Sequence, residues 1–547
     1  MSRLFNPITR ILRRRSAPIL AAGIFVVLAL LVWGVPYGND LPHHFRLAIG
    51  FTDSIRSGDL YPSWLSHTNG GFGDPCVRFY PPALYYLLAA FRLAGADWYT
   101  SAALTFALIT VAGGVGVGLW SSNYVERPYA VVAGVLYILA PFHANELFQS
   151  GMYAQYLCAS VLPFVFAFSE RILRGGRWID SVFLGLAVAA VIFSNIPFAF
   201  VGLISVGVYS AVLLWRQFSW DTGARLASGH VCGLLISAIF WVPMLLEMKW
   251  KPESGAGQGP AFDYRNNFIL GLSMDETRYF WLAALAAVTA LFVIPAYFLL
   301  SKRVGSMAAP ALVACAAFFM ATPLSKPLWD LAPLLQETQF PWRWMTVTSA
   351  CAVVLAAAAI PEYIKIWRIR RPVALAAFGM MLIAPAFTIF QVMRGADFQG
   401  RAQFNQLVEE LAGSPTNADF VPIWAKGRTV SGPESTVEIP GREATVVSWT
   451  HHRKELHIAA GAPAKARLGL YFYPHWRAIS DSGELATEPS SDGALMIDIP
   501  ETETVVNIEF IEPASTNVSY LLSLTGLLFL LGMFRRESIA RAKAGVG

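Results

Sequence analysis

A carboxylate and two imidazoles follow the first long apolar run of the chain. Asp40, His43 and His44 come soon after the stretch from Ala17 to Val35, in which nearly every residue is apolar. At about 1.5 Å per residue, a helix of this length crosses the roughly 30 Å of hydrocarbon in a bilayer. Asp40 therefore falls where hydrocarbon ends and water begins, which is the place for a general base that acts on a lipid-borne substrate. The stretch from Pro42 to Arg56 is typical of a partly amphipathic helix that begins near a proline.

The composition of the chain is that of a membrane protein. Of its 547 residues, 55% are hydrophobic and only 14% are charged, and the mean hydropathy is +0.49. The apolar residues come in repeated long runs instead of one patterned core, which excludes a soluble globular protein. The sequence contains no P-loop, nucleophile elbow or HExxH motif, so ATP-driven transport and classical hydrolysis have no support.

Eleven further apolar runs follow the first one and predict twelve membrane spans in all. These runs lie at 99–120, 129–142, 156–173, 179–194, 197–216, 224–246, 279–301, 308–322, 344–360, 372–391 and 517–534.

The segment from Pro81 to Gly95 decides the topology. It is short for a span and contains Arg92, so we interpret it as a juxtamembrane or re-entrant helix. If it crossed the membrane, the positive-inside rule would be broken by three basic loops: Arg171 to Arg177, Lys302 to Arg303, and Lys365 to Arg371. With twelve spans and the basic segment Arg10 to Arg15 inside, both termini are predicted to be cytoplasmic.

Three segments on the outer side of this topology are long: 37–98, 247–278 and 392–516. The last of them is polar and contains period-2 stretches between Gly, Pro, Ser and Asp residues, which predicts a small β-sandwich behind a helix at 401–411. We therefore expect an α-helical polytopic membrane protein with a C-terminal extracytoplasmic β-rich domain. The predicted divisions are a transmembrane domain at 1–391, the β-rich domain at 392–516, and a final span with its cytoplasmic tail at 517–547.

Imidazole and carboxylate groups on the predicted outer side are candidates for a divalent metal site. Asp40, His44 and His143 have the donor types that zinc and manganese accept. Adjacent residues on a helix point in different directions, so His43 and His44 are not expected to bind one ion together. The competing interpretation of Asp40 is a structural carboxylate at the start of a helix. The sequence leaves both interpretations open, and a divalent metal is the only cofactor that it indicates.

Several motifs resemble a known family. Those of the first outer segment are similar to the first outer loop of bacterial polytopic membrane proteins named as related to 6-pyruvoyl-tetrahydropterin synthase: Asn39 to His44, Gly58 to Trp64, Asn69 to Pro75 and Phe79 to Tyr86. Later motifs also resemble this group: Pro141 to His143, Gln339 to Arg343 and Tyr473 to Arg477. The proteins of this group are similar in layout to GT-C glycosyltransferases, which transfer a sugar from a polyprenyl-phosphate donor to an acceptor on the outer face of the membrane.

The resemblance implies roles for particular residues. Asp40 corresponds to the acidic residue that GT-C enzymes use as general base or metal ligand, and Arg78 or Arg343 is expected to stabilise the leaving phosphate. The substrate-binding residues that we expect are His43, His44, Arg78, Tyr80, His143, Gln155, Trp342 and Arg343. Interfacial anchoring is the alternative for Tyr80, Trp342 and Arg343. The expected partners are a polyprenyl-phosphate-linked sugar, an envelope glycan or lipid acceptor, and membrane lipid, in the bacterial inner membrane.

One departure from the family pattern keeps other functions open. Relatives commonly carry Arg-Gly and then Glu where this chain has Gln149 to Gln155, so a charge pair is missing. The alternatives to a glycosyltransferase are a transporter or flippase of lipid-linked glycans and a non-catalytic scaffold for envelope polysaccharide assembly. The scarcity of ionisable residues inside the spans weighs against ion-coupled transport, and the departure favours the scaffold.

Overall fold

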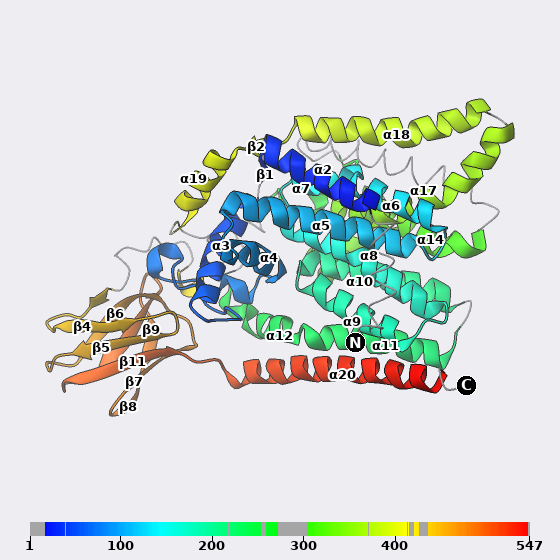
Figure 1. Cartoon of the computed structure of the whole chain (residues 1–547). Coiled ribbons are helices and arrows are strands. Elements are labelled where there is room, and N and C mark those ends of the chain that lie inside the picture. The colour runs from blue at the N-terminus through cyan, green and yellow to red at the C-terminus, as the bar shows by residue number, and fades with distance from the viewer. Residues whose placement is uncertain are drawn as a thin grey trace.

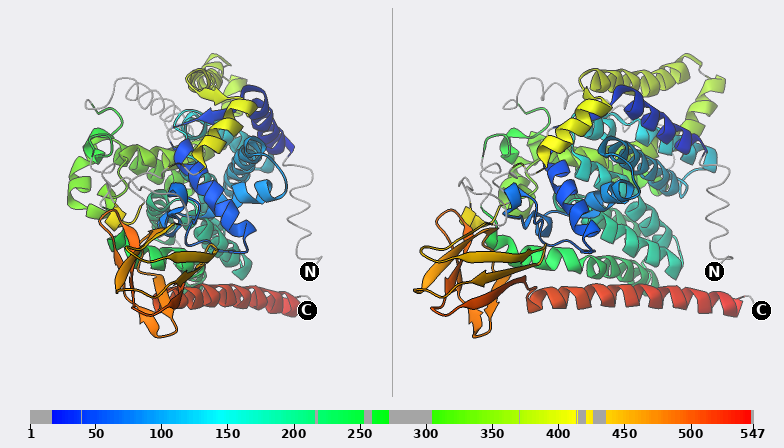
Figure 2. Two further views of the ribbon diagram at one scale, coloured as in Figure 1. Left: turned by 90° about the vertical axis from the view of Figure 1, so that its left-hand side faces the viewer. Right: turned by 60° about the vertical axis from the view of Figure 1, so that its left-hand side comes forward.

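The chain folds into a helical bundle with a β-sandwich at one end (Figure 1). The structure, a computed structural model, describes residues 17–38, 40–215, 218–252, 259–271, 304–369, 371–412, 414, 421–425 and 436–544. Two further views show the last helix running along the bundle from the sandwich to the C-terminus (Figure 2). We call the end of the bundle that carries the sandwich the loop end.

Most of the described residues are helical. The long helices are α2 (Ala17–Trp33), α3 (Leu41–Arg56), α5 (Trp98–Ser121), α8 (Tyr153–Leu173), α9 (Trp178–Ile192), α10 (Ile196–Leu214), α11 (Trp220–Ile236), α14 (Val304–Ala321), α17 (Trp344–Ile369), α18 (Arg371–Arg394) and α20 (Ala514–Ala544). Shorter ones are α4 (Ala83–Leu93), α6 (Arg127–Ile138), α7 (Pro141–Phe148), α12 (Ala238–Glu247), α15 (Lys326–Leu331), α16 (Pro333–Gln336) and α19 (Arg401–Leu411), with 3-10 turns that include η2 (Cys76–Arg78) and η8 (Pro341–Arg343).

Every predicted apolar run within the described residues coincides with a helix or with a pair of helices. The run at 129–142 becomes α6 and α7, and the run at 224–246 becomes α11 and α12. The run at 279–301 lies outside the described residues. By length and composition, five of the described helices can cross a membrane, or up to eight if each bent pair counts as one span. Twelve spans therefore stays a prediction.

The helices divide into interior and peripheral ones. In the most apolar part of the segment 341–362, which is mainly α17, 89% of the residues are buried, against 22% for the corresponding part of α20. The peripheral helices expose large apolar side chains such as Leu521 and Leu528, which suits contact with lipid tails. Close approach of α5 and α6 depends on glycines, because a Cβ on Gly134 would lie 2.5 Å from the carbonyl oxygen of Gly114.

The segment that decided the predicted topology forms a short helix. α4 has 11 residues and is therefore only about 16 Å long, roughly half of the hydrocarbon thickness. It packs with α3 beside the end of α5 at the loop end (Figure 1). This length agrees with a helix that does not cross the membrane.

The β-rich region predicted from the sequence is a sandwich of two antiparallel sheets. One sheet has the order β3-β6-β10-β9 and the other β4-β5-β11-β7-β8. The strands are β3 (Val437–Glu438), β4 (Ala444–Trp449), β5 (Arg453–Ile458), β6 (Ala464–Tyr471), β7 (Trp476–Ser480), β8 (Gly483–Leu485), β9 (Thr487–Pro489), β10 (Ala494–Ile499) and β11 (Thr504–Phe510). Buried residues of both sheets share one core, with Leu468 and Ile497 from one sheet and Leu456 and Ile508 from the other.

The first loop is built into this sandwich. Trp64 and Phe72 are buried in the sandwich core, and the backbone N–H of Tyr471 donates to the carbonyl oxygen of Phe72 at 2.8 Å. The start of the first loop also pairs with the chain just after α18, in a two-stranded ribbon of β1 (Val35–Tyr37) and β2 (Asp397–Gln399). The first loop and the sandwich therefore lie at the same end of the bundle.

Candidate functional site

Two glycines bring the start of the first loop against the turn before α8. A Cβ on Gly38 would lie 2.2 Å from the Cα of Gly151, which no side chain can tolerate. Gly151 has a φ of +65°, a left-handed conformation that glycine adopts without strain. The hydroxyl of Tyr153 also donates to the carbonyl oxygen of Pro36 at 2.6 Å. These contacts fix the backbone just before Asp40.

Asp40 stands at the start of α3 without capping it. Its carbonyl oxygen accepts from the N–H of His44 at 3.0 Å, but its side chain makes no capping hydrogen bond. The carboxylate therefore does not cap the helix, which is the structural role that the competing interpretation gave to Asp40. Burial raises the pKa of Asp40 to about 6, and the positive charge of Arg343 partly opposes that rise. Asp40 and Arg343 consequently lie within electrostatic range of each other.

His43 and His44 both pack against Tyr80, although they are adjacent on α3. Their ring centroids lie 5.3 and 5.4 Å from that of Tyr80, and Nδ1 of His44 lies 3.2 Å from the hydroxyl of Tyr85. Burial lowers the pKa of His43 to about 4 and that of His44 well below its usual range, so both imidazoles are neutral at pH 7. Burial, reinforced by the charge of Asp40, raises the pKa of the Tyr80 hydroxyl. The structure thus brings His43, His44 and Tyr80 together beside Asp40.

Arg343 is held by Gln155 of α8 and by the turn that directly precedes it. It lies in η8, which follows a turn in which Gln339 has a φ of +62°. Nε of Arg343 donates to Oε1 of Gln155 at 2.9 Å, and Nη1 donates to the carbonyl oxygen of Thr338. The guanidinium carbon lies 4.8 Å from the ring centroid of Phe340. Arg343 is only 7% exposed, so it is not an interfacial anchor with its charge in water.

A carboxylate that the sequence analysis did not select completes this arrangement. Oε1 of Glu146 accepts from Nε2 of Gln155 at 2.6 Å and from the hydroxyl of Thr346 at 2.8 Å. Nδ1 of His143 lies 3.7 Å from Oε2 of the same carboxylate. The available signal was the spacing of His143 and Glu146, because residues three apart share one face of a helix. Glu146 thus places a buried carboxylate three positions before Gln149, where the segment that lacks the charge pair of the relatives begins.

Trp342 lies in the same 3-10 turn as Arg343 but packs elsewhere. It is 4% exposed and stacks on Phe340, with ring centroids 5.0 Å apart and an interplanar angle of 20°. It also approaches Phe142 on α7, at 6.2 Å. Trp342 therefore supports the Arg343 turn from the apolar side.

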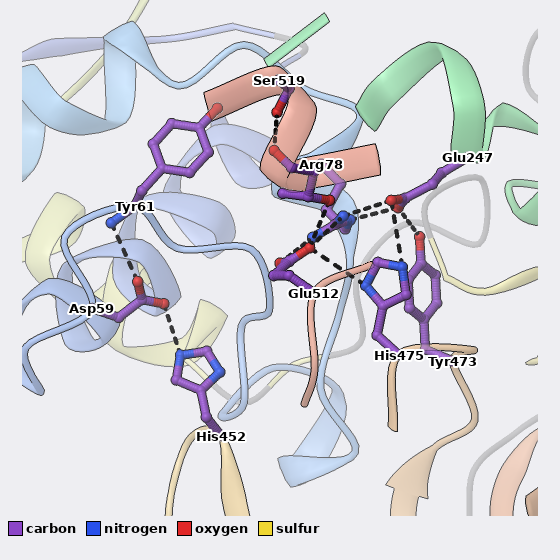
Figure 3. Close-up of polar contacts among 10 residues, drawn as sticks. Asp59, Tyr61, Arg78, Glu247, His452, Tyr473, His475, Glu512 and Ser519 are labelled. Atoms are coloured by element: carbon purple, nitrogen blue, oxygen red, sulfur yellow. Dashed lines mark hydrogen bonds and ion pairs between the residues drawn. The ribbon is translucent and has the colours of Figure 1, made fainter. Parts of the chain in front are cut away.

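Arg78 lies in a separate cluster, shown in Figure 3. Its guanidinium donates to both carboxylate oxygens of Glu247, at 2.5 and 2.6 Å, and to both of Glu512, at 2.7 and 3.0 Å. The hydroxyl of Tyr473 donates to Glu247 at 2.6 Å, and the imidazole of His475 lies between the two carboxylates. Burial alone would lower the pKa of Arg78, but the two carboxylates raise it. The charge of Arg78 is therefore already balanced.

The predicted metal ligands are not assembled into a metal site. Within the described part of the chain, no group of three His, Cys, Asp or Glu side chains is placed to hold a metal ion. The ring of His143 stacks on Tyr137 at a centroid distance of 4.4 Å, and its Nε2 faces the hydroxyl of Ser160 at 3.4 Å. Asp40 and His44 thus lack His143 as a third ligand.

Sequence comparison identifies one family. The family described as 6-pyruvoyl-tetrahydropterin synthase related domain, membrane protein, matches residues 77–393. This range contains the helices from α4 to α17, all but the last residue of α18, and the Arg343 turn. No curated protein matches the sequence.

Comparison with solved structures finds membrane glycosyltransferases of GT-C type. The arabinofuranosyltransferase AftD from Mycobacteria is 16% identical, with 70% of this chain and 27% of that chain covered and a TM-score of 0.45. The oligosaccharyltransferase AglB from Archaeoglobus fulgidus, in complex with an inhibitory peptide and a dolichol-phosphate, is 14% identical, with 78% and 62% covered and a TM-score of 0.44. ArnT from Cupriavidus metallidurans, bound to undecaprenyl phosphate, is 16% identical, with 72% and 77% covered and a TM-score of 0.37. The chain thus spans about a quarter of the length of AftD.

Proposed function

The chain belongs to the family of membrane proteins described as 6-pyruvoyl-tetrahydropterin synthase related, and from this premise we propose that it is a membrane glycosyltransferase. The proposed donor is a sugar on a polyprenyl phosphate, and the proposed acceptor is an envelope glycan or lipid. The reaction takes place at the loop end, on the outer face of the bacterial inner membrane. Both termini then lie in the cytoplasm.

The observation that carries this proposal is the pairing of Asp40 with Arg343. Transfer to a hydroxyl acceptor needs a base for the acceptor proton and a cation for the leaving phosphate. Asp40 has a pKa of about 6, which is close to neutrality and therefore suits proton transfer at pH 7. Arg343 is near enough to act on the Asp40 charge, and the planar guanidinium matches the geometry of a phosphate.

The proposed step balances as follows. The acceptor hydroxyl oxygen attacks the anomeric carbon, and a new carbon–oxygen bond forms there. The bond between the anomeric carbon and the phosphate oxygen breaks, with its electron pair staying on the polyprenyl phosphate beside Arg343. Asp40 takes the acceptor proton. Tyr80 and the neutral imidazoles of His43 and His44 line the site and orient the sugar through their hydroxyl and ring nitrogens.

Arg78 has no place in this phosphate site. Its hydrogen bonds to Glu247 and Glu512 would have to break before it could bind a phosphate, leaving the buried carboxylate of Glu247 and the partly buried one of Glu512 without a counter-charge. We therefore assign the cation of the reaction to Arg343 and give Arg78 a structural role. Gln155 and Glu146 act on the reaction by positioning Arg343.

The proposal is tested with the purified full chain in proteoliposomes. Undecaprenyl-phosphate-linked sugars are offered as a panel, and release of undecaprenyl phosphate is measured so that the identity of the sugar does not have to be known in advance. Asp40→Asn should abolish release. Arg343→Ala should nearly eliminate it, whereas Arg343→Lys should release undecaprenyl phosphate at a reduced level, because Lys keeps the positive charge but lacks the two parallel N–H donors of the guanidinium. Asp53→Asn on the same helix and Arg401→Lys at the loop end are the matched controls and should behave like the wild type.

Two results would replace this proposal by one of the alternatives. If labelled lipid-linked sugar crosses the bilayer intact, with no release of undecaprenyl phosphate, the protein is a transporter. If the wild-type chain neither releases nor moves the lipid but binds envelope glycan through the sandwich, the protein is a scaffold.

A further inference from the structure

A pocket lies where the first loop meets the ends of two membrane-capable helices. Its polar side is formed by Tyr61 and Arg78 of the first loop, by Glu512 just before α20, and by Thr516 and Tyr520 in the first turns of α20. Its enclosed volume is about 20 Å³, which is room for one group of about the size of a water molecule. The pocket is therefore suited to a small group and is too small for a lipid-linked oligosaccharide.

The other wall of the pocket is apolar and belongs to α12. Ile239, Phe240 and Pro243 line it. Together, α11 and α12 form a bent pair that is long and apolar enough to cross a membrane. Tyr520 is 38% exposed on α20, which is itself long and apolar enough to cross a membrane. The pocket thus has polar groups at the end of the two helices and apolar surface along them, which is the arrangement that a phospholipid meets at the level of its headgroup.

The charges around the pocket favour a cation. Arg78 contributes one positive charge, and its partners Glu247 and Glu512 contribute two negative ones. His475 faces both carboxylates, at 3.5 and 3.7 Å, and its pKa is lowered to about 4 by burial and by Arg78, so it adds no charge at pH 7. The cluster therefore carries a net negative charge, and Asp59 on the same loop lies close enough to influence Tyr520.

The same cluster disfavours an anion. Four of the five N–H donors of the Arg78 guanidinium are engaged by the two carboxylates, so at most one is left for an anion. The remaining polar groups are oxygens, with the hydroxyl of Thr516 already donating to Glu512 at 3.0 Å. Figure 3 shows the Tyr61 ring reaching from the first loop toward α20, beside Arg78 and Glu512. Carboxylate oxygens and the faces of two tyrosine rings are the groups that recognise an ammonium ion.

We propose that this pocket binds the ammonium headgroup of a zwitterionic phospholipid, with Glu512, Tyr61 and Tyr520 around the ammonium and the acyl chains along α12. The lipid is a structural partner that seats the first loop and the sandwich on the membrane surface. This site is separate from the Asp40 and Arg343 site and does not depend on the proposed reaction.

The test is native mass spectrometry of the full chain, delipidated in detergent and then offered equal amounts of phosphatidylethanolamine and phosphatidylglycerol. The wild type should retain phosphatidylethanolamine with a preference of about tenfold, as expected when one charge-assisted hydrogen bond is gained. Glu512→Gln and Tyr520→Leu should each reduce this preference at least threefold. Leu521→Ala, the neighbouring position on α20 with a 63% exposed side chain, should keep it.

The two pocket variants and the competing lipid together show whether the pocket recognises the ammonium headgroup. Glu512 also belongs to the ion cluster, whereas Tyr520 does not bond Arg78, so Tyr520→Leu gives a result even if Glu512→Gln fails to fold. Equal retention of the two lipids by the wild type, or an unchanged preference in Tyr520→Leu, would overturn the proposal. Displacement of the lipid by millimolar free ethanolamine would show that the pocket takes any small ammonium compound, and the lipid assignment would then be wrong.

Discussion

Nε of Arg343 donates a hydrogen bond of 2.9 Å to Oε1 of Gln155, and the amide nitrogen of the same Gln155 donates to Glu146 at 2.6 Å. The amide therefore lies between the guanidinium and a buried carboxylate and separates their charges. A direct ion pair between Arg343 and Glu146 would neutralise the cation, whereas the intervening amide orients Arg343 and leaves its charge available. In the reaction that we propose, this relationship leaves the charge of the buried Arg343 available to the donor phosphate.

Replacing Gln155 tests whether it positions Arg343. Gln155→Met keeps the side-chain volume but removes both hydrogen bonds, so we expect donor use at limiting concentration to fall by about tenfold. The kcat at saturating donor should change less than the KM, because the lost interaction orients the donor site. Helix content measured by circular dichroism should stay unchanged. Equal loss of kcat with an unaltered KM would contradict the positioning role.

The contact between Gly38 and Gly151 should be intolerant of a methyl group. Gly38→Ala places a Cβ 2.2 Å from the Cα of Gly151 and should displace the segment that leads to Asp40. We expect a destabilisation of about 1–3 kcal/mol and a marked loss of transfer activity. Gly207→Ala on α10, where a Cβ would meet nothing within 4 Å, is the control. Thermal unfolding and lipid phosphate release measure the two effects, and wild-type behaviour of Gly38→Ala would show that the loop position does not matter.

The pKa of Asp40 predicts how activity and stability depend on pH. A base with a pKa of about 6 loses its function as it is protonated, so the rate should fall as the pH drops from 7 to 5. The folded state holds this proton more tightly than the unfolded chain, whose value is near 3.8, so stability contributed by this group decreases as the pH rises from about 4 to about 6. Asp40→Asn should therefore be inactive yet at least as stable as the wild type at pH 7.5. A pH-rate profile that is flat between 5 and 7 would exclude Asp40 as the base.

Arg78 is expected to act on stability instead of donor binding. Arg78→Met leaves the buried carboxylate of Glu247 and the partly buried carboxylate of Glu512 without their counter-charge and should destabilise the protein by about 3–5 kcal/mol. The double variant Arg78→Met with Glu247→Gln should recover part of this loss, because the more deeply buried of the two charges is then removed. Arg56→Met, an exposed arginine of the same region, should change little. The folded fraction of Arg78→Met should bind donor normally, and a raised KM for the donor would restore the phosphate role.

The helices were predictable because their apolar runs are continuous in the sequence. The runs around α5, α8 and α10 have the length and hydropathy of spans, and local sequence is enough to find them. The sandwich was also predictable, since its strands alternate between buried and exposed positions, as β7 does. The turn of the first loop that carries Asp40 was recognisable by its position after α2.

The partners of each charged residue were not predictable in the same way. Arg78 meets Glu247 and Glu512, which lie 169 and 434 positions away, and only the packing of three segments brings them together. His143 was grouped with Asp40 by donor type, but the bend of 40° between α6 and α7 places its ring among Tyr137 and Tyr156. Tertiary contacts of this kind are set by helix packing, which the periodicity of one sequence does not determine.

The location of the lipid phosphate tests the pairing of Asp40 and Arg343 most directly. The measurement is an electron cryomicroscopy structure of the full chain with a polyprenyl-phosphate analogue bound. We predict that the phosphate accepts hydrogen bonds from the guanidinium of Arg343 on the side that faces Asp40, with Gln155 still in place behind it. A phosphate bound elsewhere, with Arg343 facing only protein and lipid tails, would contradict the proposed function.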